Sequence, residues 1–266
     1  MEAVLFLHIA TDNLHRIVSV DCAFYGCCAA PPIVGYQTTD TIAKGQYIAL
    51  GTVFTDVSGA DIAIKDLFTY AEGTPAGNAN VGSADQIWRW NTAAAKWTKY
   101  YYYSARGKVS CWANTEAPAV ETTDTIGPGE TFFFLRNGTA AVKLNLAGAV
   151  KELTGTTSIT VSKGQLAFAS NPFPVEMSIQ DFTKYYVSGT PAGNANVGSA
   201  DQVWRWNTTT SKWTKYYYYS ARGKESCWAC TDNPAVPTTD KIAAGEGFFF
   251  QRAGSAVATL TFGLGE

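Results

Sequence analysis

The chain has few of the residues and motifs on which most enzymes and membrane proteins depend. Its only two histidines, His8 and His15, precede the repeated part of the sequence, so the repeats lack the base of the usual serine or cysteine triad. No glycine-rich phosphate loop or dinucleotide-binding fingerprint is present. No apolar run approaches the roughly 18 residues of a membrane-spanning helix. We therefore expect a protein without catalytic activity and without an integral membrane segment.

Charge is also scarce, at 16% of residues with a net charge of -2. This balance gives no electrostatic attraction to nucleic acid or to an anionic membrane, and we expect neither as a partner. Aromatic residues, by contrast, reach 14%, and 24 glycines accompany frequent Thr, Asn and Asp. Such a mixture is typical of many short strands joined by turns.

The sequence repeats itself with a fixed offset of 116 positions, which relates Gly73 to Gly189 and Trp88 to Trp204. Internal repetition of this kind indicates duplicated structural units. We expect an all-β protein with two tandem antiparallel β-sandwich or Greek-key domains, at residues 33–150 and 151–266, after an amino-terminal segment at 1–32. The apolar runs Tyr47–Leu50, Phe132–Leu135, Leu166–Ala169 and Phe248–Phe250 are the predicted buried strands.

One block of the repeat is almost unchanged between the copies. Residues 73–108 and 189–224 differ at only four positions, three of which lie together in a short loop. Either a shared requirement held the block constant or local gene conversion refreshed it. The differing pairs are Ile87/Val203, Ala93/Thr209, Ala94/Thr210 and Ala95/Ser211.

The block contains a predicted aromatic hairpin in each copy. Pairing "DQIWRWN" with "KWTKYYYY" through the loop 92–95 sets Trp90 opposite Trp97 and Trp88 opposite Lys99, and avoids an Arg–Lys pair. Because side chains alternate along a strand, the four tyrosines cannot all face one core. These aromatic side chains either form a cross-strand ladder that mainly stabilises the sheet or serve as a contact surface for a partner. The predicted contact surface is made of Trp88, Trp90, Trp97, Tyr100, Tyr101, Tyr102, Tyr103, Trp204, Trp206, Trp213, Tyr216, Tyr217, Tyr218 and Tyr219.

The loop before each hairpin and the cysteines offer two further kinds of site. Closely spaced oxygens make calcium a candidate cofactor, although the same residues are ordinary in turns. Disulfides are favoured over zinc, since CxxC occurs once, at 227–230. The calcium candidates are Asn78, Asn80, Asp85, Asn194, Asn196 and Asp201, and the disulfide candidates are Cys22, Cys27, Cys28, Cys111, Cys227 and Cys230.

The amino-terminal 32 residues allow three interpretations. They are a poorly formed secretory signal, the product of a misassigned start codon, or a folded hairpin in which Val4 to Ile9 pairs with Ile17 to Tyr25. In the third case either strand could instead complete a sheet edge in a neighbouring copy of the chain.

The segments "GQLAFASNPFP" at 164, "ADQVWRWNTTTSKWTKYYYY" at 200 and "AAGEGFFF" at 243 resemble β-rich tandem repeats of large secreted or surface-attached bacterial proteins. The resemblance implies an extracellular or cell-surface setting. We expect a structural protein that assembles with copies of itself into a filament or layer. The alternative is a carbohydrate-binding tandem module, with polysaccharide as the partner. A glycoside hydrolase or lyase is less favoured, with carboxylates at Asp85, Glu116 and Glu130 and their counterparts Asp201, Asp232 and Glu246.

Overall fold

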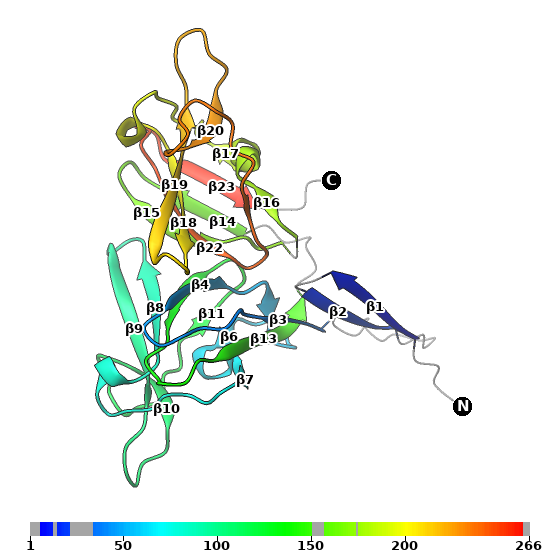
Figure 1. Ribbon diagram of the computed structural model, residues 1–266, viewed down its shortest axis with the longest axis vertical. Coiled ribbons are helices and arrows are strands. Elements are labelled where there is room, and N and C mark those ends of the chain that lie inside the picture. Colours follow the sequence, from blue (N-terminus) through cyan, green and yellow to red (C-terminus); the bar gives the residue numbers. More distant parts are fainter. Residues whose placement is uncertain (1–5, 13–14, 22–33, 151–156, 174, 263–266) are drawn as a thin grey trace.

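The computed structural model describes residues 6–12, 15–21, 34–150, 157–173 and 175–262. The fold is predominantly β, built from antiparallel sheets that occupy two lobes along the long axis (Figure 1). The four helices in this part of the chain are short 3-10 turns, η1 (Ile64–Asp66), η2 (Val81–Ser83), η3 (Ile179–Tyr185) and η4 (Val197–Ser199).

The first repeat contributes three sheets. The largest has the order β1 (Phe6–Asp12), β2 (His15–Asp21), β3 (Val34–Thr38), β13 (Lys143–Val150) and β5 (Phe54–Thr55), and β7 (Thr69–Glu72) also pairs with β13. The second has the order β10 (Cys111–Asn114), β9 (Lys96–Tyr103), β8 (Gln86–Asn91), β12 (Thr131–Leu135) and β4 (Tyr47–Gly51). The third pairs β6 (Ile62–Ala63) with β11 (Thr125–Ile126).

The second repeat also has three sheets, and its five-stranded sheet has the same strand order as that of the first repeat. Strand β14 (Thr157–Val161) lies beside β23 (Ala258–Phe262), which pairs with β17 (Tyr186–Ser188). The five-stranded sheet runs β15 (Leu166–Ser170), β22 (Gly247–Gln251), β18 (Gln202–Asn207), β19 (Lys212–Tyr219) and β20 (Cys227–Cys230). A short pair joins β16 (Met177–Ser178) to β21 (Lys241–Ile242). All four predicted strands are present to within one residue at each end, as β4, β12, β15 and β22. Their predicted burial is confirmed for β12 and nearly all of β22, whereas β4 and β15 are buried only in part.

Each repeat has a main hydrophobic core and a smaller second one. In the first repeat the main core contains Ile87, Tyr100 and Phe132, and the second contains Ala84 and Tyr101. The second repeat has corresponding clusters. The two small cores cover the face of the tyrosine strand that the main core does not reach.

The expected amino-terminal hairpin is present with shifted bounds, because β1 and β2 pair antiparallel from Phe6 and Asp21 inward. Strand β2 then adds to β3, which joins the hairpin to the first repeat. The hairpin projects from the side of the molecule (Figure 1).

Candidate functional site

The aromatic hairpin forms in the predicted register in both repeats. Trp90 lies opposite Trp97 and Trp88 lies opposite Lys99, and the second repeat reproduces these pairs. The Lys99 ammonium sits 3.8 Å from the centre of the Trp88 ring, and Lys215 sits 3.9 Å from that of Trp204. Alternation along β8 and β9 therefore places three tryptophans of each repeat on one face.

These two tryptophan faces are turned toward each other across the contact between the repeats. Trp90 lies 5.8 Å from Phe249, and Trp206 lies 5.6 Å from Phe133, measured between ring centres. Phe168 stacks on both phenylalanines, at 5.0 Å from Phe133 and 4.4 Å from Phe249. Edge-to-face and stacked pairs at these separations are favourable beyond the area they bury.

Polar contacts between the repeats are reciprocal. The indole N–H of Trp90 donates to the Leu166 carbonyl at 2.9 Å, and that of Trp206 donates to the Tyr47 carbonyl at 2.8 Å. In the backbone, Gly51 donates to Gly245 at 2.7 Å. Ser170, which ends β15 as Gly51 ends β4, donates to Gly129 at 3.1 Å. Paired contacts of this kind are those of an interface around an approximate two-fold axis.

The facing aromatic side chains leave an open groove of about 360 Å³ between the repeats. This volume lies within the range of small-molecule sites. Trp88 lines the groove, whereas its counterpart Trp204 does not. The lining residues are Tyr47, Trp88, Trp90, Trp97, Phe133, Leu166, Trp206, Trp213 and Phe249. Of the predicted contact surface, five of the six tryptophans therefore line one groove, and Trp204 does not.

The prediction that tyrosines of the run are displayed on the surface is wrong for the middle of each strand. Tyr100 and Tyr101 are each only 1% exposed, as are Tyr216 and Tyr217. The physical reason is the second small core, in which η2 and β10 cover Tyr101. The outer residues Tyr102, Tyr103, Tyr218 and Tyr219 are partly exposed.

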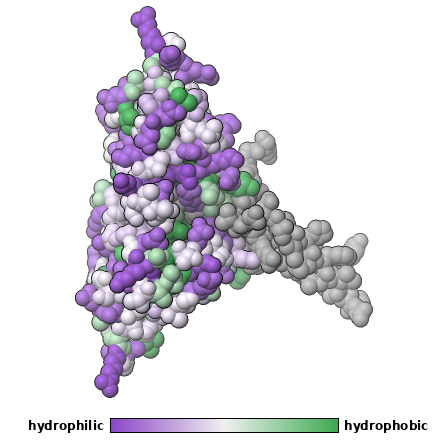
Figure 2. Space-filling view, viewed as in Figure 1, coloured by the Kyte–Doolittle hydropathy of each residue, from purple (hydrophilic) through white to green (hydrophobic). Residues whose placement is uncertain are grey.

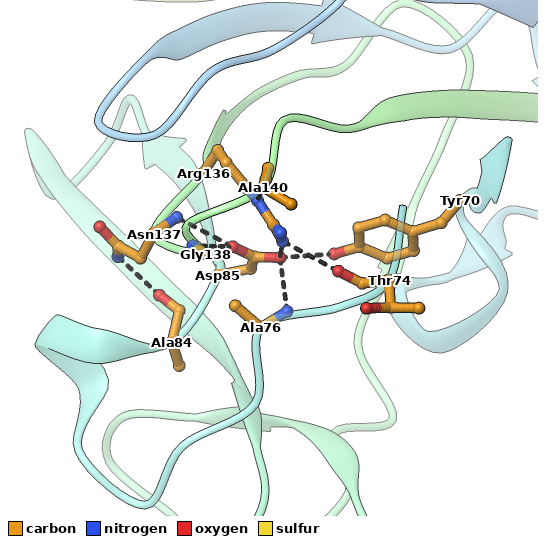
Figure 3. A network of polar contacts seen from close by, with 9 residues as sticks. All are labelled: Tyr70, Thr74, Ala76, Ala84, Asp85, Arg136, Asn137, Gly138 and Ala140. Carbon is orange, nitrogen blue, oxygen red and sulfur yellow. Dashed lines mark hydrogen bonds and ion pairs between the residues drawn. The ribbon is translucent and has the colours of Figure 1, made fainter. Parts of the chain in front are cut away.

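Asp85 lies at the centre of a buried polar network (Figure 3). Its carboxylate accepts from the Arg136 guanidinium at 2.5 Å and from the Tyr70 hydroxyl at 2.9 Å. Backbone N–H groups of Ala76 and Asn137 donate to it as well, each at 2.9 Å. Burial, followed by the charge of Asp85, raises the pKa of Tyr70.

The second repeat builds the same network around Asp201, Arg252 and Tyr186. Asn78 and Asn80 accept hydrogen bonds from backbone N–H groups two residues ahead, as Asn194 and Asn196 do in the second repeat. The oxygens proposed as calcium ligands are thus engaged within the protein, in turns and in an ion pair. The described residues also contain no cluster of three or more His, Cys, Asp or Glu side chains suited to a metal ion.

The cysteines within the described ranges are not bonded to one another. Cys111 and Cys227 are buried thiols, and Cys230 is partly buried. Burial, and next the nearby Glu121, raises the pKa of Cys111, while burial and then Glu225 raise that of Cys227. The remaining disulfide candidates, Cys22, Cys27 and Cys28, lie outside the described residues.

The carboxylates considered for catalysis are dispersed among different contacts. Asp85 serves the buried network, and Glu130 forms an ion pair with Arg89 at 2.6 Å. Glu246 makes the equivalent pair with Arg205. Glu116 and Asp232 are exposed.

Several residues of the site were not predicted as site residues from the sequence. Tyr47, Leu166 and Phe168 come from strands in which the two copies differ, so the repeat pattern did not single them out. Arg136 and Arg252 could have been found as the same residue type at equivalent positions next to an apolar strand.

Over the ranges that the structure covers, no helix has the length and hydrophobicity required to cross a membrane. No family model, curated protein or solved structure matches this chain.

Proposed function

We propose that this chain is a non-enzymatic binding protein made of two duplicated β-sandwich domains, and that the groove between them binds a carbohydrate chain outside the cell. The observation that carries the proposal is the groove itself, lined by five tryptophans from both repeats. The extracellular setting follows from the resemblance to repeats of secreted bacterial proteins.

The chemistry of the lining suits a sugar ring. Flat indole faces offer large, rigid contact area for the apolar C–H face of a pyranose. Lys99 stands over Trp88, which lines the groove, and its ammonium group is a donor for hydroxyl groups. Few such polar groups are needed to fix orientation in a mainly apolar site.

The arrangement also supports one shared site over two separate ones. Because the tryptophan faces of the repeats meet, a ligand in the groove contacts both copies at once. A chain of repeating sugar units can present similar faces to both sides of an approximately symmetric groove. The two repeats then build one site together, and the duplication does not act by providing two separate sites that gain avidity.

The repeat supplies a matched pair of variants for the test. Trp88→Ala removes a ring that lines the groove. Trp204→Ala removes the equivalent ring, which does not line the groove but packs against the lining residues Trp213 and Phe249. Binding to a glycan array and to insoluble polysaccharides should fall roughly tenfold or more for W88A, as for other anchoring aromatics. The loss should be clearly smaller for W204A, which keeps every lining residue in place of removing one.

Two results would overturn the proposal. The first is that wild-type protein binds none of the saccharides presented, which would contradict carbohydrate binding in the groove. Equal losses in W88A and W204A would mean that binding does not take place in the groove. Circular dichroism of both variants separates lost binding from lost folding.

Assembly into a filament is the second candidate function. It is favoured by the sheet order, in which β1 and β14 are edge strands of their sheets within the described residues. Exposed edges can pair with strands of another chain, and unlike edges meeting head to tail give open filaments. Electron micrographs of the same preparations distinguish the two functions, since ordered fibres support assembly and dispersed particles contradict it.

A further inference from the structure

The contact between the repeats joins equivalent positions of unlike size. In the first repeat Gly51 lies beside Thr131 in the sheet, and in the second repeat Ser170 lies beside Gly247 at the corresponding place. Each repeat therefore presents one glycine and one hydroxyl-bearing side chain at this point, but on opposite strands.

Across the interface each glycine faces the side chain of the other repeat. A Cβ atom added to Gly51 would overlap the Cβ and Oγ of Ser170. A Cβ atom added to Gly247 would overlap the Cγ2 of Thr131. Ser170 and Thr131 are almost fully buried, at 1% and 3% exposure. The space between the repeats thus holds one side chain at each of the two places and has no room for a second.

A third pair of equivalent positions also combines a small residue in one repeat with a larger one in the other. Ala49 pairs with Phe133 in its sheet, as Phe168 pairs with Phe249. Only Phe168 is large enough to stack between the two phenylalanines. Two alanines here would leave a void, and two phenylalanines would compete for one space.

These differences decide which repeats can pair. Two first repeats brought together around the same axis would set Thr131 against Thr131, and two second repeats would set Ser170 against Ser170. The indole hydrogen bonds of Trp90 and Trp206 do not discriminate between the two repeat types, because their acceptors are main-chain carbonyls. Steric conflict in the wrong combinations is a common source of specificity.

We infer that the contact face of each repeat is a pairing surface that accepts a repeat of the other type and excludes its own type. The partner that fits the first repeat is a second repeat, from the same chain or from another copy of this chain. The arrangement prevents like repeats from associating when many copies of the protein are close together.

Exchanging residues across the interface in the full-length chain tests this inference. Gly51→Ser places two side chains in the space for one, so its urea unfolding midpoint should fall clearly below that of wild type, with loss of the near-ultraviolet tryptophan signal. The double variant G51S/S170G restores one side chain per place with the two repeats interchanged, and should recover most of both losses. Gly82→Ser is the control, since Gly82 is exposed with only the Asn80 Oδ1 within 4 Å of its added Cβ, and it should match wild type.

The place where Gly247 faces Thr131 gives a second test. G247T should lower the urea unfolding midpoint, and the double variant G247T/T131G should recover most of that loss. The inference is overturned if G51S unfolds at the wild-type midpoint, or if the double variant is no more stable than G51S. A G51S protein that fails to fold still leaves the test decisive, because recovery or failure of the double variant gives the answer.

Discussion

Replacing Asp85 with asparagine should be among the most destabilising single changes in the first repeat. The substitution keeps the shape of the side chain and removes its charge. Arg136, whose side chain is 3% exposed, would then hold a buried guanidinium without a counterion. The Tyr70 hydroxyl and two backbone N–H groups would also lose a charged acceptor.

The expected cost follows from comparison with an exposed pair. Breaking a buried ion pair by removing one partner costs about 3–5 kcal/mol, because an uncompensated charge stays buried. A solvent-exposed pair contributes about 0–1 kcal/mol, and Lys143 with Glu72 is such a pair on the same repeat. Since a native domain is stable by about 5–15 kcal/mol, D85N should remove a large share of the stability, whereas K143A should remove little.

Urea unfolding followed by tryptophan fluorescence measures both changes. Asp201→Asn serves as an internal repetition, because the second repeat has the same network. The double variant D85N/R136M should be more stable than D85N, since it no longer buries an unpaired charge. A loss below about 1 kcal/mol in D85N, or a double variant less stable than the single one, would refute the electrostatic argument.

Two further predictions concern pH and the hairpin loop. Burial, and then the charge of Asp85, raises the pKa of Tyr70, and burial and Asp201 do the same for Tyr186. Each tyrosine therefore contributes stability that is fully present below its ordinary pKa near 10 and is lost as the pH rises above it. Relative to wild type, Y70F should weaken the fall of unfolding free energy above pH 10 by roughly 1.4 kcal/mol per pH unit, and an unchanged slope would contradict this. Ala95 has a φ of 48°, so A95G should raise stability by about 0.5–1 kcal/mol while A94G should not; urea midpoints decide.

The parts of the site formed by neighbouring strands could be predicted from the sequence, whereas those that depend on contacts with distant segments could not. Alternation along the strand and the avoidance of an Arg–Lys pair were enough to predict the hairpin register. The burial of Tyr101 could not be predicted in the same way, because its cover comes from η2 and β10. The tyrosine side chains do alternate between the two faces of β9, but both faces are covered, one by the main core and the other by the small core.

The buried network shows the same limit. Asp85 was recognisable as a residue with turn-forming neighbours, but its partner Arg136 lies 51 positions further along the chain. Oxygen-rich loops give similar sequences whether they bind a cation or accept internal hydrogen bonds. Only the proximity of Arg136 and Tyr70 separates the two cases.

The pattern of identity between the copies has a partial physical explanation. Residues that meet an equivalent environment in both repeats, such as Trp90 and Asp85, are under the same constraint twice and are the same in both copies. Residues that face their own counterpart across the interface, such as Gly51 and Ser170, must differ for the space to be filled once. A symmetric contact within one chain therefore favours identical residues at most equivalent positions of the two repeats. It favours different residues at the equivalent positions that touch each other at the axis. Nothing in the structure explains why the exposed Lys108 is also repeated, at Lys224, so the interface accounts for the aromatic hairpin and not for the whole constant block.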